Sequence, residues 1–198
     1  GLAYLDFMAP GVLAQSILFT SIFFGIAIIW ERDLGILQKT LVSPAYRSAL
    51  VLGKALSAGV RALSQSVIVV VVALLLGVRI RLQPLPWMGV ALAVVVGAAV
   101  FSTFSLVVAC VVKTRERFMG MGQVLTMPLF FASNAIYPIS IMPSWLQVIS
   151  QINPLTYEVD ALRLLMIAGG ASTYGLVLDL AVLIAATAIM VVLAGRLY

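Results

Sequence analysis

Long apolar stretches alternate with short polar ones along the chain. Five of these stretches are about as long as the ~20 helical residues that cross a bilayer. The pattern predicts membrane-spanning helices over residues 10–30, 49–76, 87–112, 118–136 and 174–193. Residues 137–170 are also apolar, but prolines and glycines interrupt them, so we interpret this segment as two short helices with a break at Asn153-Pro154.

The composition is that of a membrane protein. Hydrophobic residues make up 63% of the chain and charged residues only 10%, whereas a soluble domain carries about 25% charged residues. We therefore predict an all-α, polytopic transmembrane bundle that forms one domain over residues 1–198. The chain opens with glycine near an apolar stretch and lacks the features of a signal peptide, so we interpret it as N-terminally truncated.

The basic residues predict the orientation of the bundle. Most of them lie in segments 31–61 and 113–117 and at Arg196, which fall on one side of the predicted spans. The positive-inside rule makes this side cytoplasmic, so residues 137–170 lie outside or re-enter the outer leaflet. Because the net charge of +5 is spread among short loops, the pattern indicates contact with membrane lipid and no nucleic-acid partner.

A charged, amphipathic segment separates the first two spans. At helical spacing over residues 30–42, four apolar side chains share one stripe and three other residues lie opposite. The stripe is Trp30, Leu34, Leu37 and Leu41, and the opposite face holds Arg32, Gly35 and Lys39. Pro44 would end this helix, because proline disfavours helical geometry at Ser43 and lacks an N–H. The residues alone equally allow a simple interfacial connector.

Three motifs resemble those of a known permease family. They are residues 31–44 (ERDLGILQKTLVSP, followed by Arg47 and Gly53-Lys54), 4–11 (YLDFMAPG) and 153–163 (NPLTYEVDALR). These motifs, and their order along the chain, resemble those of the type-2 ABC exporter permeases. The resemblance is greatest to the bacterial drug-resistance and polysaccharide-export group that includes the daunorubicin exporters. The intact family has six spans, so the resemblance implies that the first span is missing here.

The resemblance implies a function and partners. The chain would be the permease of an ATP-driven exporter in the bacterial plasma (inner) membrane, moving a drug, a lipid or a lipid-linked glycan out of the cytoplasm. Its partners would be an ABC ATPase subunit or domain and a second permease copy, identical or different. Residues 31–44 would be the coupling segment that docks on the ATPase. The expected coupling residues are Glu31, Arg32, Leu34, Gly35, Leu37, Gln38, Lys39, Leu41, Ser43 and Pro44.

The third motif resembles the extracellular re-entrant helix of the same family. Its expected gate residues are Asn153, Pro154, Tyr157, Glu158 and Arg163. Asn153 is a favourable N-cap and Pro154 a favourable first helical residue. The charges favour a shallow site near the outer headgroups, or one that faces protein or water, and Asp160 could pair with Arg163 at i, i+3. The alternative is a folded loop that only packs the spans.

Polar and aromatic residues inside the spans are candidates for lining a pathway. They are Gln15, Gln123, Thr126, Phe130 and Asn134. Such polar side chains are more often hydrogen-bond partners between helices, and a phenylalanine can simply face lipid. Three pairs of small residues are spaced for close helix approach. These pairs are Ser21 with Gly25, Gly53 with Ser57, and Ala93 with Gly97.

The sequence offers little for catalysis. Histidine is absent and the single cysteine, Cys110, lies in an apolar run, so we predict no metal site and no catalytic residue. A Gly-x-x-x-x-Gly-Lys-Ser/Thr phosphate loop is missing too. We therefore expect that the chain is not an enzyme and that ATP and Mg²⁺ bind to the partner ATPase. An intramembrane enzyme would also need catalytic groups of this kind.

An ion-gradient-driven secondary transporter or channel is the main alternative function. It would need an ion or proton site within the membrane, commonly formed by acidic residues at mid-depth. None of the 7 acidic residues is predicted to lie in the middle of a span, and Asp179 is expected at the outer interface. The pattern of acidic residues therefore favours the ATP-driven permease.

Overall fold

The computed structural model describes residues 4–35, 47–81, 83–112 and 114–197. Within these ranges the chain is helical, and the only strand-like feature is an isolated bridge between Ile80 and Ile167. Long apolar segments form helices because the backbone N–H and C=O groups of a helix bond to each other. The core of a bilayer offers these groups no other partner. The predicted all-α bundle is confirmed.

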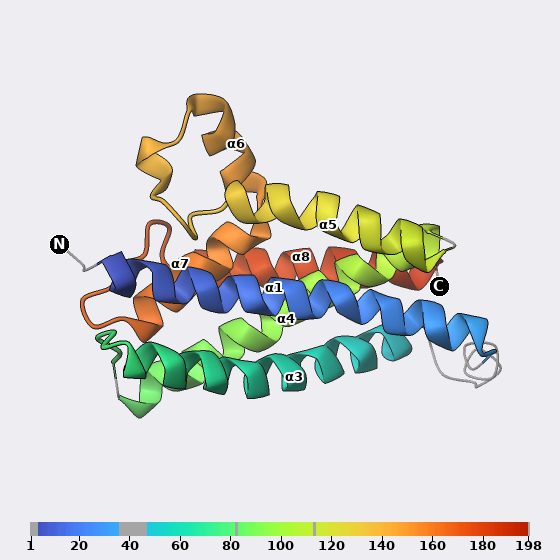
Figure 1. The fold of residues 1–198 in the computed structure, drawn as a ribbon, viewed down its shortest axis with the longest axis horizontal. Helices are drawn as coiled ribbons and strands as arrows, with labels where there is room; N and C mark the ends of the chain where they lie inside the picture. Colours follow the sequence, from blue (N-terminus) through green and yellow to red (C-terminus); the bar gives the residue numbers. More distant parts are fainter. Residues whose placement is uncertain (1–3, 36–46, 82, 113, 198) are drawn as a thin grey trace.

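The long helices lie alongside one another (Figure 1). They are α1 (Tyr4–Asp33), α3 (Arg47–Leu75), α4 (Pro84–Val111), α5 (Arg115–Phe131) and α8 (Leu176–Leu197). Between α5 and α8 the chain forms a 3-10 turn and two short helices. These elements are η1 (Ile139–Ile141), α6 (Ser144–Ile152) and α7 (Pro154–Met166).

Four of these helices are long and apolar enough to cross a membrane: α1, α3, α4 and α8. They correspond to four of the five predicted spans. The fifth, α5, has 17 residues and ends at Phe131, because the chain turns before reaching the expected end of the span at residue 136. At 1.5 Å per residue α5 is roughly 25 Å long, which is at the lower limit for a span. That α5 crosses the membrane stays a prediction.

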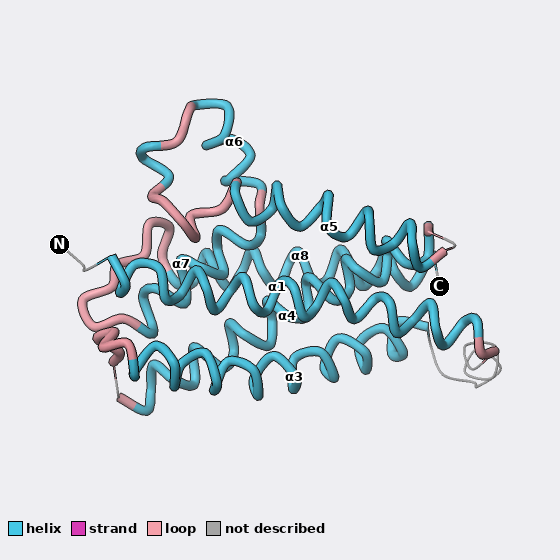
Figure 2. Tube along the Cα trace, viewed as in Figure 1, coloured by secondary structure: helices cyan, strands magenta, loops and turns pink. Residues whose placement is uncertain are grey.

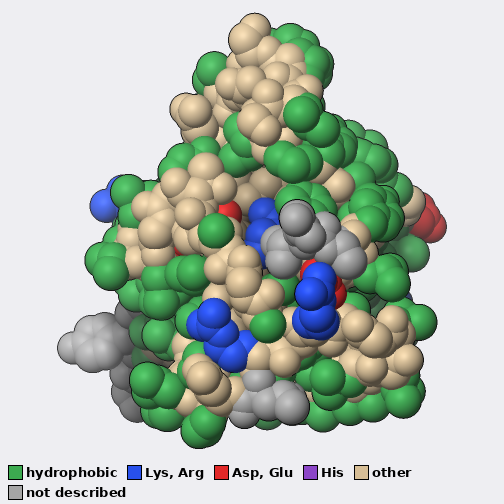
Figure 3. Space-filling model, turned by 90° about the vertical axis from the view of Figure 1, so that its left-hand side faces the viewer, with side chains coloured by type: hydrophobic (Ala, Val, Ile, Leu, Met, Phe, Trp, Pro, Cys, Tyr) green, Lys and Arg blue, Asp and Glu red, His purple; other side chains and the backbone are tan. Residues whose placement is uncertain are grey.

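The ends of the long helices group as the predicted alternation of spans requires. The C-terminal ends of α1, α4 and α8 and the N-terminal ends of α3 and α5 lie at one end of the bundle (Figure 1). This is the end predicted to be cytoplasmic. At the opposite end, a face-on view shows a few basic side chains among apolar and polar ones (Figure 3).

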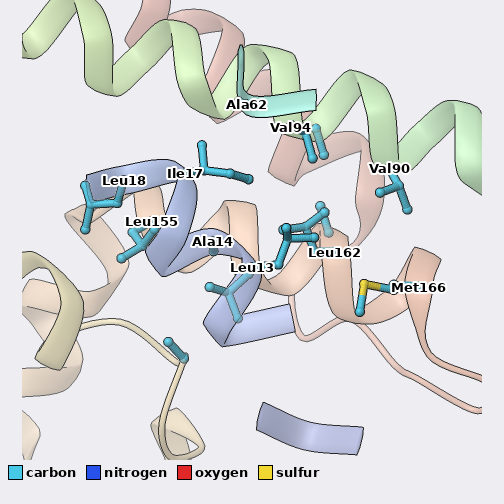
Figure 4. Packing of buried hydrophobic residues seen from close by; sticks show 14 of the residues in the cluster. Leu13, Ala14, Ile17, Leu18, Ala62, Val90, Val94, Leu155, Leu162 and Met166 are labelled. Atoms are coloured by element: carbon cyan, nitrogen blue, oxygen red, sulfur yellow. The ribbon is translucent and has the colours of Figure 1, made fainter. Parts of the chain in front are cut away.

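The core is built around α4, which packs against α1, α3, α7 and α8. Leu13 and Ile17 of α1 meet Val94 of α4 and Leu162 of α7 in this core (Figure 4). The apolar side predicted for the second short helix is confirmed, since Leu155, Val159, Leu162 and Met166 are all buried.

Two of the three predicted close approaches occur. The Ser105 hydroxyl of α4 accepts a hydrogen bond from the Gly25 N–H of α1 at 3.1 Å, and a side chain at position 25 would overlap Ser105. Gly97 of α4 is also closely approached, since a side chain at position 97 would overlap Glu158 of α7. The third prediction is wrong, because Gly53 is exposed and has nothing within 4 Å of its side-chain position.

Helix α6 lies apart from the bundle, beside the C-terminal end of α5 (Figure 2). Its exposed side chains are mostly large and apolar. They are Trp145, Val148, Ile149 and Ile152. An exposed apolar helix near the end of a membrane bundle suits the interfacial region, where tryptophan is enriched.

Candidate functional site

The predicted break in the re-entrant region is confirmed. The Asn153 side chain caps α7 by accepting a hydrogen bond from the Leu155 N–H at 3.0 Å. Its amide group also donates to the Leu129 carbonyl of α5 at 2.6 Å. Pro154 occupies the first turn of α7, where its missing N–H has no helical partner to lose. Asn153 thus fixes both the turn between α6 and α7 and its attachment to α5.

Helix α7 is buried on every side. It packs against α1, α4 and α8, and its charged residues Glu158, Asp160 and Arg163 are buried with its apolar ones. Of the two predicted environments for these charges, the structure therefore shows the protein interior. Charges in such a place require partners, and Asp160 and Arg163 find theirs in segments outside α7.

Asp160 anchors the loop between α7 and α8. Its carboxylate accepts hydrogen bonds from the Thr173 N–H at 2.7 Å and the Tyr174 N–H at 3.1 Å. The Ser172 hydroxyl donates to the same oxygen at 2.8 Å. An oxygen that accepts three hydrogen bonds from one loop ties this loop firmly to α7. The sequence predicts Asp160 only as a possible partner of Arg163, not as a contact of this loop.

The predicted pair of Asp160 and Arg163 is wrong. The Arg163 guanidinium instead donates to the Asn134 carbonyl at 2.8 Å and lies 4.0 Å from the centre of the Phe7 ring. The loop N–H groups already occupy Asp160, so the arginine turns toward α1 and the segment after α5. Arg163 therefore joins three parts of the chain that are distant in sequence.

Asp179 lies in the first turn of α8 and is fully buried. Its Oδ2 is 3.2 Å from the Ser172 hydroxyl, so it faces the same loop as Asp160. Asp179 lies near the start of α8 as expected, but protein covers its side chain. Its place relative to the outer membrane interface stays a prediction. The Ser172 hydroxyl has one proton to donate and two carboxylates beside it.

Tyr157, a predicted gate residue, pairs with Tyr174 of the same loop. The ring centroids are 5.2 Å apart, and the Tyr157 hydroxyl donates to the Gln151 carbonyl at 2.6 Å. Burial, and secondly Tyr157, raise the pKa of the Tyr174 phenol. The Tyr174 ring is therefore neutral at physiological pH, as an apolar contact between two rings requires.

The end of α7 is joined by its backbone to the loop between α3 and α4. The Arg81 N–H donates to the Met166 carbonyl at 2.9 Å, and the Ala168 N–H donates to the Arg79 carbonyl at 2.9 Å. Arg79 also binds the buried Asp6 of α1 through its backbone N–H at 3.0 Å and its side chain at 3.2 Å. Sequence reasoning missed this role of Asp6, although it lies within one of the three motifs.

Glu158 is the remaining predicted gate residue and has no partner. Neither of its carboxyl oxygens makes a hydrogen bond to a described residue, and the side chain is completely buried. It lies against Gly97, which is near the middle of α4 (Pro84–Val111). The expectation that no acidic residue lies at mid-span is therefore wrong for Glu158, because a neighbouring short helix brings it there.

At the opposite end of the bundle, α1 continues through Asp33 and then stops. Gly35 has a φ of 70°, in the left-handed region that commonly ends helices. A single helix over residues 30–42 is therefore wrong at this glycine. Glu31, Arg32, Leu34 and Gly35 are described. The other predicted coupling residues, Leu37, Gln38, Lys39, Leu41, Ser43 and Pro44, lie outside the described residues.

Two ion pairs connect this end of α1 to its neighbours. Glu31 pairs with Lys54 of α3, and Asp33 pairs with Arg115 of α5 at 3.0 Å. The Arg115 guanidinium also stacks over the Trp30 ring at 3.8 Å. The sequence contained the signal for these pairs, since acidic and basic residues alternate among loops on one predicted side. It did not show which of them meet.

The predicted lining residues do not share one environment. Thr126 is buried and donates to the Gly122 carbonyl of its own helix at 2.5 Å. Asn134 is buried 3.5 Å from Asp160. Gln123 is exposed, and Gln15 and Phe130 are half-buried. Whether any of them lines a pathway stays a prediction.

An apolar crevice lies where α5 meets the α6–α7 hairpin. It has a volume of about 340 Å³. Its walls include Leu125, Pro128 and Leu129 from α5 and Ile149 and Ile152 from α6. Such a crevice can hold an apolar group, and it adjoins the capped turn at Asn153.

Known proteins resemble the chain over most of its length. The model of the ABC-2 type transporter family matches residues 1–167. The daunorubicin resistance ABC transporter permease protein DrrB1 of Streptomyces coeruleorubidus is 28% identical over 195 residues, covering 98% of this chain and 69% of that protein.

Two other relatives match a shorter part. The putative transport permease ycf38 of Cyanophora paradoxa is 32% identical over 167 residues, covering 82% of this chain and 56% of that protein. The inner membrane transport permease YadH of Escherichia coli K12 is 24% identical over 169 residues, covering 82% and 63% respectively. The chain thus spans a little over half the length of the ycf38 protein.

Proposed function

Because the chain belongs to the ABC-2 type transporter family, we propose that it is the membrane permease of an ATP-driven ABC exporter. The family match over residues 1–167 is the observation that carries this proposal. The cargo is a hydrophobic or amphipathic molecule such as a drug, a lipid or a lipid-linked glycan. A relative named for daunorubicin resistance supports a drug-like cargo, and one named as an inner membrane permease supports the bacterial plasma membrane.

Energy enters at the cytoplasmic end. A partner ABC ATPase, which holds ATP and Mg²⁺, grips the segment that follows α1. The pairs of Glu31 with Lys54 and of Asp33 with Arg115 support this proposal, because they join the end of α1 to α3 and α5. A displacement of the gripped segment therefore reaches several helices together. The ATP cycle supplies the free-energy difference between the two global states.

The pathway lies between two permease copies, and the α6–α7 hairpin closes its outer end. Two features support the gate: α7 lies among α1, α4 and α8, and an apolar crevice adjoins its first turn. Opening then consists of separating α7 from its neighbours, which exposes buried polar groups to water. The alternative, a hairpin that only packs the spans, predicts no such movement.

The test is reconstitution of the full chain with its partner. The chain is affinity-purified in mild detergent, a co-eluting ATPase with a phosphate loop is identified, and both are placed in liposomes with a hydrophobic dye. ATP-dependent dye accumulation that stops when the phosphate-loop lysine of the ATPase is changed to alanine supports the exporter. Accumulation driven by a proton or sodium gradient without the ATPase would instead establish a secondary transporter.

A further inference from the structure

Glu158 differs from the other buried charged residues of α7. Asp160 accepts hydrogen bonds from the loop after α7, and Arg163 donates to Asn134 and stacks on Phe7. Both oxygens of Glu158, in contrast, are fully buried and have no hydrogen-bond partner in the part of the chain that the structure describes. The side chain nevertheless points at α4, where a side chain at position 97 in place of Gly97 would overlap the carboxyl group.

The helices around α7 offer Glu158 no positive charge. α4 carries no Asp, Glu, Lys or Arg between residues 84 and 111, and its one other titratable group is Cys110 near its far end. The groups on α1, α7 and α8 are at helix ends or engaged elsewhere. They are Tyr4, Asp6, Glu31, Arg32 and Asp33 of α1, Tyr157, Asp160 and Arg163 of α7, and Asp179 and Arg196 of α8. None of them forms a hydrogen bond or ion pair with Glu158.

The ligand that fits this group is a proton. An isolated carboxylate inside a protein is far less stable than the neutral acid, so such a group becomes protonated. A metal ion would need several oxygen or nitrogen ligands, and the described residues contain no group of three or more acidic, cysteine or histidine side chains that could hold one. A neutral carboxylic acid, in contrast, needs no counter-charge.

We propose that Glu158 is a proton-binding site, which is occupied while α7 packs against α4 and empties to water when this contact opens. The carboxylate takes one proton from water on closing and returns it on opening, and no other bond changes. The bound proton follows from the buried contact alone. Its release once per cycle rests on the proposed transport function.

The direction of the pH effect follows from this difference in proton affinity. The closed state holds the proton more tightly than the open state, so raising the pH favours opening and lowering it favours closure. One proton released per opening changes the opening equilibrium by at most about tenfold per pH unit. The dependence reflects the pH on the side to which α7 opens, which in the predicted orientation is the outer side.

Infrared spectroscopy tests the bound proton directly. The chain contains three glutamates, Glu31, Glu116 and Glu158, and Glu31 pairs with Lys54 while Glu116 is exposed. The full chain carrying 13C-carboxyl glutamate is purified into lipid nanodiscs at neutral pH. We expect an isotope-shifted carbonyl band of a protonated acid in the wild type and none in Glu158→Gln. Only ionised carboxylate bands in the labelled wild type would overturn the proposal, whether or not the variant folds.

Transport measurements test the release step. In liposomes with the partner ATPase, we expect the rate to depend on external pH in the wild type and to lose most of this dependence in Glu158→Gln. Glu116→Gln on exposed α5 surface is the matched control and should keep the wild-type profile. Identical profiles in all three proteins would refute release during the cycle. A protonated Glu158 without ATP-driven transport would refute the exporter and leave the proton site standing.

Discussion

The Glu158 carboxyl group on α7 occupies the space that a side chain at position 97 of α4 would need. A Cβ placed on Gly97 would overlap both carboxyl oxygens. The two residues are 61 positions apart, at 97 and 158, yet the residue at each position limits the size of the side chain that fits at the other. The contact brings an acidic group to the middle of a membrane-spanning helix, and the first prediction follows from it.

Gly97→Ala should destabilise the protein by ~1–3 kcal/mol, because the added methyl group overpacks the α4–α7 contact. Thermal unfolding in detergent measures the effect. In a Glu158→Ala background the same change should have a much smaller effect, and the coupling free energy should exceed ~0.5 kcal/mol. Gly53→Ala is the control, since nothing lies within 4 Å of that position. Strictly additive effects at 97 and 158 would contradict the contact.

Asp160→Asn should loosen the loop between α7 and α8. The new amide group replaces an acceptor that faces the N–H groups of Thr173 and Tyr174, so we expect a loss of roughly 1.5–3 kcal/mol. Limited proteolysis of residues 171–175, followed by mass spectrometry, measures the loosening. Ser172→Ala removes a single donor and should have a smaller effect. Equal cleavage of the wild type and Asp160→Asn would show that Asp160 does not hold the loop.

Arg115→Ala should uncouple ATP hydrolysis from transport. It removes both the pair with Asp33 and the stack on Trp30, and with them the connection from α1 to the start of α5. Stability should change by about 1 kcal/mol or less, because the side chains of the pair are partly exposed, at 39% and 44%. The measurement is dye transported per ATP hydrolysed, which we expect to fall severalfold.

Two variants separate this role of Arg115 from its charge. Arg115→Lys keeps the charge but loses the planar stack, so its coupling should lie between the wild type and Arg115→Ala. Arg117→Ala removes an exposed arginine from the same turn and should couple normally. If Arg117→Ala impairs transport per ATP as much as Arg115→Ala does, general positive charge is responsible and the link between α1 and α5 is not.

Gly35→Leu should also uncouple the ATPase, through the backbone. The φ of 70° at Gly35 is unfavourable by ~1–2 kcal/mol for residues with a Cβ. No described residue lies within 4 Å of its side-chain position, so the effect comes from the backbone and not from a clash with them. The chain after α1 would then leave in a different direction. Gly35→Asn tests this explanation, since asparagine tolerates the left-handed region. Transport per ATP should be retained in the asparagine variant and reduced in the leucine variant.

Features with local signals were predictable from the sequence. The break before α7 follows from an N-cap asparagine and a proline, which act on their own turn of helix. The long apolar runs defined four helices because lipid allows few other structures. At Gly35 two local signals compete: the apolar stripe over residues 30–42 predicts a continuous helix, whereas the glycine ends α1.

Contacts between distant segments could not be predicted. The spacing of Asp160 and Arg163 suggests a pair, but backbone N–H groups of the following loop bind the aspartate instead. Nothing in the sequence shows that loop donors and a carbonyl after α5 would be closer. The burial of Glu158 likewise depends on how α7 inserts beside α4, and a helix with charges at three positions gives no local indication of complete burial.

The two backbone hydrogen bonds between residues 79–81 and 166–168 have a mechanical consequence. They attach the last turn of α7 to the loop that joins α3 to α4. Helix α7, attached in this way, cannot move freely at its C-terminal end. Because Asn153 ties the other end of α7 to α5, any outward movement of α7 has to break hydrogen bonds at one of its two ends.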